Sequence, residues 1–176
     1  MKVMTSVLFI AVLGLPLTVS QMEPASGGTY GGETDCAPVA ELVAFIAEET
    51  GYPPLRYCPR VSVTNGASLK AILGLKASAH GAEPLAAYLA ASAEILVTPD
   101  VVLTTPLGRS YLVHELVHAH QFDNDAPAHA PCVGWLEGEA YRVQASYLRM
   151  HDLAADAFAF ELLGLLQSAC AHSYHP

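Results

Sequence analysis

The stretch SYLVHELVHAHQ, residues 110–121, carries three of the chain's eight histidines and one glutamate. Its other side chains are mostly apolar and no proline interrupts it, so it predicts a buried helix from just after Pro106 to about Phe122. Titratable side chains are costly in a buried helix unless they have partners. The stretch therefore indicates either a metal site or a coincidence in a histidine-rich chain.

The spacing of His114, Glu115 and His118 favours the metal. Residues four apart lie on one face of a helix, so two imidazoles at this spacing can bind one ion at about 2.0–2.1 Å each. The glutamate follows the first histidine directly, and its carboxylate can take a proton from water at the ion without binding the ion itself. The pattern H-E-x-x-H thus gives all three residues one purpose, whereas the alternative is two hydrogen-bonded core histidines.

The composition indicates one globular domain and excludes some partners. The chain has 176 residues, 52% hydrophobic and 14% charged, which allows a substantial core. Its formal net charge is -9, and its eight lysines and arginines are scattered. Phosphate binding needs clustered cations, so nucleic acid is not expected as a partner.

The N-terminus has the pattern of a secretory signal peptide at residues 1–20. Its apolar run, Val7–Leu17, is shorter than the roughly 20 residues of a membrane span, and Pro16 interrupts it. We therefore expect a secreted or periplasmic protein with no stable membrane insertion after the signal is removed. Residues 21–35 are rich in glycine and small polar residues and predict a flexible leader, and residues 36–176 predict a single domain.

All four cysteines follow the signal peptide. An even number of cysteines in an exported chain predicts two disulfides. Of the three possible pairings, we expect the two local ones, Cys36–Cys58 and Cys132–Cys170. There is no C-x-x-C pair, which argues against a cysteine-rich zinc ribbon, and buried free thiols are the alternative.

Hydrophobic periodicity predicts further helices over residues 37–51, 134–150 and 154–169. Alanines favour helix over residues 86–93 as well, and residues 67–79 fit helix or strand equally. The expected class is therefore α+β and mostly helical.

The predicted β structure is small. Alternating residues over 60–64 predict a short strand that ends in an Asn-Gly turn. Glu94–Thr105 predicts two further strands, with Pro99 and Asp100 as the turn between them.

At the H-E-x-x-H motif the chain resembles the zincin metallopeptidases, in which one helix carries this motif between uncharged neighbours. The chain departs from the usual pattern twice: His120 replaces a hydrophobic residue, and Tyr111 replaces valine or threonine. The metzincin pattern is excluded, because it needs glycine and histidine where the chain has Gln121 and Asn124. The resemblance covers about residues 106–148.

The gluzincin group of zincins takes its third ligand from a glutamate on a following helix, and the chain offers Glu137 and Glu139. The resemblance favours Glu137. Helix geometry also favours Glu137, because the helical stripe from this residue continues through the polar residues Tyr141 and Gln144. Glu139 stays an alternative third ligand, with the loop residues Asp125 and His129 as lesser ones.

The residues around the proposed ligands have several candidate roles. Where gluzincins have an aspartate that supports a histidine ligand, this chain has Tyr141, so Gln121, Asp123 and Glu139 become candidates for that supporting role. His120 points off the metal face and is expected at the surface or in the supporting shell. Trp135 is expected in the core between helices, and two residues near the C-terminus, His172 and His175, are expected in an exposed tail.

The resemblance implies a secreted, minimal zincin-like zinc metallopeptidase. His114, His118 and Glu137 would hold Zn²⁺, and Glu115 would act as general base in the hydrolysis of a peptide or protein substrate. Tyr141 could donate to the oxyanion of the tetrahedral intermediate, although a buried tyrosine with one hydrogen bond is the simpler interpretation. The alternatives are a zincin-like protein that binds zinc without turnover and a helical interaction domain with a chance motif. Substrate specificity and oligomeric state are left open.

Overall fold

The computed structural model describes residues 36, 39–75 and 83–170. The predicted signal peptide, the predicted leader and the two C-terminal histidines, His172 and His175, lie outside the described residues. The elements in chain order are α1 (Ala40–Thr50), β1 (Arg60–Val63), α2 (Gly66–Ile72), β2 (Ala86–Leu89), β3 (Glu94–Val97), α3 (Pro106–Asp123), α4 (Ala126–His129), α5 (Val133–Met150) and α6 (Ala154–Ser168).

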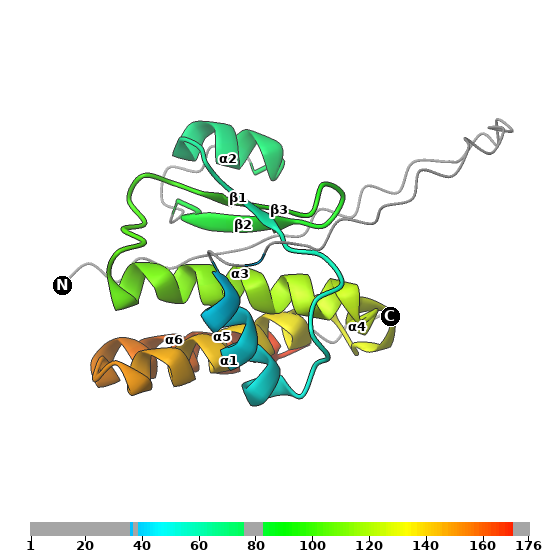
Figure 1. Cartoon of the computed structure of the whole chain (residues 1–176), viewed down its shortest axis with the longest axis vertical. Helices are drawn as coiled ribbons and strands as arrows, with labels where there is room; N and C mark the ends of the chain where they lie inside the picture. Colours follow the sequence, from blue (N-terminus) through cyan, green and yellow to red (C-terminus); the bar gives the residue numbers. More distant parts are fainter. Residues whose placement is uncertain (1–35, 37–38, 76–82, 171–176) are drawn as a thin grey trace, which may run out of the picture.

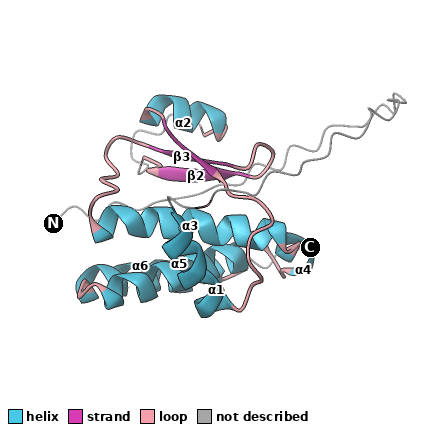
Figure 2. Cartoon of the chain, viewed as in Figure 1, coloured by secondary structure: helices cyan, strands magenta, loops and turns pink. Residues whose placement is uncertain are grey.

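The described chain is mostly helical with one small sheet, which confirms the predicted α+β class (Figure 2). The strand order is β1-β3-β2, with β1 parallel and β2 antiparallel to β3. Figure 1 shows the sheet between α2 on one face and α3 on the other, with α5 and α6 on the far side of α3. None of the described helices is both long and apolar enough to cross a membrane. Helix α3 is thus covered on two sides, which explains why most of its residues are buried.

Both faces of the sheet are buried at β2 and β3, whereas β1 is partly exposed. Ala87 and Leu96 pack against Leu69 of α2, whereas Tyr88 and Ile95 belong to the large core that includes α3. Alternate residues of a strand point to opposite faces, so helices on both faces bury successive side chains. The predicted helix over residues 86–93 was therefore wrong: small alanines fit a strand enclosed on both faces, and this packing overrides their helix propensity.

The second half of the predicted β element was also wrong. Strand β3 ends at Val97, and residues 101–105 turn into α3. Thr105 caps this helix, because its side-chain oxygen accepts a hydrogen bond from the backbone N–H of Gly108 at 3.1 Å. The strands that pair with β3 are instead β1 and β2.

Local capping also explains two smaller differences. Asn65 makes no turn between strands; its side chain accepts from the backbone N–H of Ser68 at 2.8 Å and caps α2. Residues 67–79 fitted helix or strand equally, and the cap shows that this segment begins as helix. The loop predicted after α3 contains one short helix, α4.

Helices α5 and α6 approach closely at glycines. A Cβ atom at Gly134 would lie 2.1 Å from the backbone oxygen of Gln167, and one at Gly138 would lie 2.6 Å from the Cβ of Ser168. The disulfide Cys132–Cys170 joins the same ends of the two helices, and Cys36–Cys58 is the second disulfide. Both predicted pairings are confirmed. This packing sets the rotation of α5 about its axis, and hence which side chains α5 turns toward α3.

Candidate metal centre

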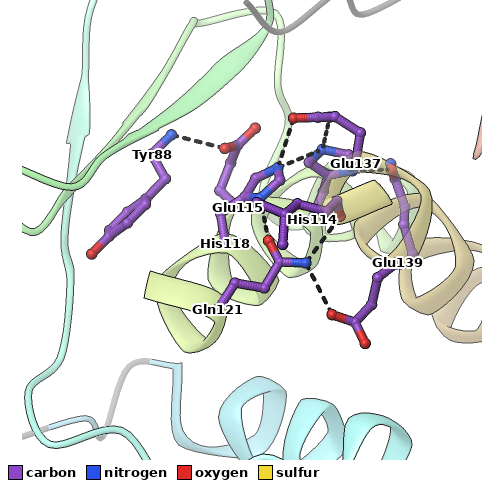
Figure 3. Close-up of polar contacts among 9 residues, drawn as sticks. Tyr88, His114, Glu115, His118, Gln121, Glu137 and Glu139 are labelled. Carbon is purple, nitrogen blue, oxygen red and sulfur yellow. Dashed lines mark hydrogen bonds and ion pairs between the residues drawn. The ribbon is translucent and has the colours of Figure 1, made fainter. Parts of the chain in front are cut away.

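Three buried side chains from two helices converge on one point. Helix α3 presents His114 and His118 one turn apart, and α5 places Glu137 opposite them (Figure 3). The two Nε2 atoms are 3.2 Å apart, and each lies 3.4 Å from one oxygen of Glu137. The three residues are 5%, 1% and 3% exposed, respectively. The ligand atoms are close enough together for the group to hold a metal ion.

The amide of Gln121 fixes the proton position on His118. Its Nε2 donates to the backbone oxygen of Leu136 at 2.9 Å and to Glu139 at 3.0 Å. Its Oε1 therefore faces His118 Nδ1, at 2.8 Å. A carbonyl oxygen only accepts hydrogen bonds, so Nδ1 carries a proton and Nε2 is left to bind a cation.

Gln144 does the same for His114. The Ser110 hydroxyl donates to the backbone oxygen of Leu107 at 2.7 Å and accepts from Gln144 Nε2 at 3.1 Å. Gln144 Oε1 then faces His114 Nδ1, at 3.1 Å. Both imidazoles are thus held with Nδ1 protonated and Nε2 directed at the same point.

The arrangement fits a tetrahedral metal ion. Metal–nitrogen distances of about 2.0–2.1 Å place two such Nε2 atoms roughly 3.3–3.4 Å apart, close to the observed 3.2 Å. Within the part of the chain that the structure describes, Glu137 Oε1 is a buried oxygen that makes no hydrogen bond, and its ion-pair neighbour His118 Nε2 lies 3.4 Å away. Buried polar atoms without a partner are rare and need an explanation. A ligand role for this oxygen provides one.

Without a metal, a proton occupies the same place. Burial opposes a charge on His118, but the nearby Glu137 carboxylate, followed by Glu115 and Gln121, outweighs burial and raises the pKa of His118 to about 9. Burial also opposes the charge on Glu137, yet His118 and His114 hold the pKa of this carboxyl well below its usual range. The metal-free centre is therefore an imidazolium beside a carboxylate at neutral pH.

Metal binding should consequently depend on pH. A metal must displace the proton from His118, so below a pKa of about 9 the affinity falls as the pH falls, by about tenfold per pH unit for one proton. A chelator competition series between pH 6 and pH 8 measures this dependence. An affinity that is equal at both ends of the series would contradict the proton-filled metal-free centre.

Glu115 lies beside the histidine pair and is held in place by the sheet. The backbone N–H of Tyr88 in β2 donates to Glu115 Oε2 at 2.8 Å (Figure 3). Burial raises the pKa of Glu115, while the neighbouring His114 and His118 act in the opposite direction without cancelling the rise. A bound cation would strengthen this opposing effect and keep the carboxylate ionised, as a general base requires.

Tyr141 packs against the first histidine. Its ring centroid is 4.5 Å from that of His114 and 6.1 Å from that of Phe160, and the residue is 1% exposed. Burial, together with the charges of Glu137 and Glu115, raises the pKa of its hydroxyl above the usual range. The hydroxyl therefore stays protonated and keeps its capacity to donate.

Glu139 does not join the histidines. Its Oε2 accepts from the Tyr52 hydroxyl at 2.9 Å and from Gln121 Nε2 at 3.0 Å, and its Oε1 lies 3.7 Å from Arg142. The structure thus brings Glu137, and not Glu139, to the candidate centre. Glu139 instead supports His118 indirectly, through Gln121, in the role that the sequence had left open.

Other candidates lie elsewhere. Asp123, one of the three candidates for supporting a histidine ligand, instead accepts from the backbone N–H of Arg56 at 2.9 Å and pairs with its guanidinium at 2.8 Å. Asp125 and His129 are both largely exposed and lie 4.0 Å from each other, outside the group that could hold a metal.

Two further expectations need correction. His120 is fully buried beside Tyr52, with ring centroids 6.2 Å apart, and burial lowers its pKa. The expectation of a surface position was therefore wrong. Trp135 is 47% exposed on α5 and is not a core residue.

The roles of two groups at the centre were not predicted from the sequence. Gln144 was recognised as polar on the Glu137 stripe but was given no role, although its spacing of seven residues from Glu137 was a usable signal. The role of the Tyr88 backbone N–H could not be predicted from the sequence, because its contact with Glu115 depends on how β2 lies against α3.

A comparison with known families matches residues 32–176 to one described as Domain of unknown function (DUF6647). The chain belongs to this family. The match spans both helices of the candidate centre. No curated protein and no solved structure matches the chain.

Proposed function

We propose that this DUF6647 protein is a zinc metallopeptidase, similar to the gluzincins, that hydrolyses peptide bonds. One observation carries the proposal: the Glu137 carboxylate, on a separate helix, has one oxygen 3.4 Å from His114 Nε2 and the other 3.4 Å from His118 Nε2. If the motif occurred by chance, there would be no reason for a carboxylate to lie beside both histidines. Two imidazoles and one carboxylate are also a ligand set that suits Zn²⁺.

The proposed ligands are His114, His118 and Glu137. Zn²⁺ bound by them would lower the pKa of a water molecule and polarise the scissile carbonyl. Glu115 accepts the proton from the water and delivers it to the leaving amine. The Tyr88 N–H holds the Glu115 carboxylate in one orientation for both transfers.

Tyr141 is proposed as a helper at the carbonyl. Its raised pKa keeps the hydroxyl protonated, and its ring lies against His114. In this position it could donate a hydrogen bond to the negative charge that develops on the carbonyl oxygen.

The number of ligands distinguishes a catalytic centre from a structural one. Structural zinc sites are closed by four protein ligands, whereas catalytic sites keep a position open for water. The described residues supply a group of three. A buried Glu115 at 4% exposure is also costly to retain in a protein that only binds the metal.

The setting of the proposed enzyme is outside the cytosol. Two disulfides fit an extracellular or periplasmic protein, because such bonds persist in oxidising compartments. This agrees with the signal peptide predicted at residues 1–20.

The test uses the oxidised protein loaded with zinc and a library of unstructured peptides analysed by mass spectrometry. We expect cleavage that stops when a chelator removes the metal and returns when zinc is restored. Stoichiometric zinc without cleavage of any peptide would favour the protein that binds zinc without turnover. Absence of zinc binding would instead favour the interaction domain.

A further inference from the structure

Both ligand histidines are supported by glutamine and not by a carboxylate. The side-chain oxygens of Gln121 and Gln144 lie 2.8 Å from His118 Nδ1 and 3.1 Å from His114 Nδ1. The two glutamines come from different helices, α3 and α5, and are 0% and 1% exposed. Helix geometry brings Gln121 close to His118, three residues earlier on the same helix, but it gives no reason for Gln144 of α5 to reach His114.

Each amide is itself fixed by its nitrogen. Gln121 donates to the Leu136 backbone oxygen and to Glu139, and Gln144 donates to the Ser110 hydroxyl. Because these partners accept the amide protons, neither side chain can flip without losing its hydrogen bonds. The two oxygens are thus presented to the imidazoles in a single orientation.

We propose that Gln144 and Gln121 are positioning residues that hold both imidazoles in the tautomer and ring orientation that bind the metal through Nε2. The inference rests on the proposed zinc centre and deepens it. An imidazole without an acceptor at Nδ1 can place its proton on either nitrogen and can rotate. Metal binding must then select one arrangement, which weakens affinity by about 10–100-fold in comparable sites.

Charge explains why the supporting residues are amides. Zn²⁺ with the carboxylates of Glu115 and Glu137 sums to zero (+2 − 1 − 1), and both carboxylates are buried. Carboxylates in place of both glutamines would leave two uncompensated negative charges in the core, which is costly. Neutral amides orient the histidines without adding charge.

Gln144 offers the cleaner test, because Gln121 also binds Glu139 and the backbone. Gln144→Met keeps the length of the side chain and removes the acceptor, whereas Gln144→Glu keeps an acceptor at the same place. For a positioning role we expect zinc affinity to fall about 10–100-fold in Gln144→Met and to be retained or increased in Gln144→Glu. A role in packing alone predicts the reverse order, since methionine packs well in a core and a buried carboxylate does not.

The measurements are the zinc dissociation constant by chelator competition, the visible spectrum of the Co²⁺-loaded protein, and the thermal stability of the metal-free form. Ser110→Ala provides a milder variant if Gln144→Met does not fold. It removes the partner of Gln144 Nε2, and we expect about 2- to 10-fold weaker zinc binding and an altered Co²⁺ spectrum.

Four results would overturn the inference. They are unchanged zinc affinity in Gln144→Met, equal loss in Gln144→Met and Gln144→Glu, a larger loss in Gln144→Glu than in Gln144→Met, or unchanged affinity and spectrum in Ser110→Ala. These results differ from failure of the proposed function, in which the wild-type protein itself would bind no zinc and the inference would fall with it.

Discussion

Replacing Glu115 with glutamine is expected to slow peptide hydrolysis by about 10²–10⁴-fold while the protein keeps its zinc. Glutamine has nearly the same shape as glutamate, and its oxygen can still accept from the Tyr88 N–H. It cannot take a proton from water, however, so only the proton transfers are lost. The measurement is the hydrolysis rate of the best library peptide at saturating zinc, together with the zinc content of each protein.

Glu83→Gln is the matched control for Glu115→Gln. Glu83 is 61% exposed and pairs with Lys70, so the same chemical change occurs far from the proposed chemistry. We expect an unchanged rate for this variant. A Glu115→Gln protein that binds zinc and works within about threefold of the wild-type rate would refute the general-base assignment.

Replacing Glu137 with glutamine is expected to weaken zinc binding by more than the roughly 10–100-fold that loss of a supporting residue costs. The change removes a charged ligand and leaves two neutral imidazoles. Zinc at one hundred times its dissociation constant stabilises a protein by about 2.7 kcal/mol. We expect this stabilisation in the wild-type protein, and its near-complete loss in Glu137→Gln, in thermal melts with and without zinc.

Glu139→Gln is the matched control, because the residue lies on the same helix only two positions further on. It contacts Gln121 and not the ligand histidines directly. Any loss of zinc affinity in Glu139→Gln should therefore stay within the range of a supporting residue. Equal losses of zinc affinity in the two variants, or a larger loss in Glu139→Gln, would contradict the assignment of Glu137 as the third ligand.

The histidine pair was predictable because it depends on one helix alone. Two residues four apart must share a face whatever the rest of the chain does. The choice between Glu137 and Glu139 was harder, since it depends on the rotation of α5 about its axis. Contacts with α6 at Gly134 and Gly138 set this rotation, and the sequence indicated the helix but not its partner surface.

The sheet could not be predicted from local composition alone. Residues 86–89 have the composition of a helix and become a strand because helices cover both faces of the sheet. The misassignment of this strand also concealed the Tyr88 N–H that holds Glu115. The supporting role of Gln144 was missed for a related reason: it requires α3 and α5 to lie side by side at one particular register.

We propose that one metal ion lies between His114, His118 and Glu137. Crystals of the zinc-loaded protein, measured on both sides of the zinc absorption edge, would show the position of the ion directly. We expect one strong anomalous peak within about 2.0–2.2 Å of both Nε2 atoms and a Glu137 oxygen. A fully loaded crystal with no peak there, or with its peak on Glu139 or on the exposed Asp125 and His129, would contradict it.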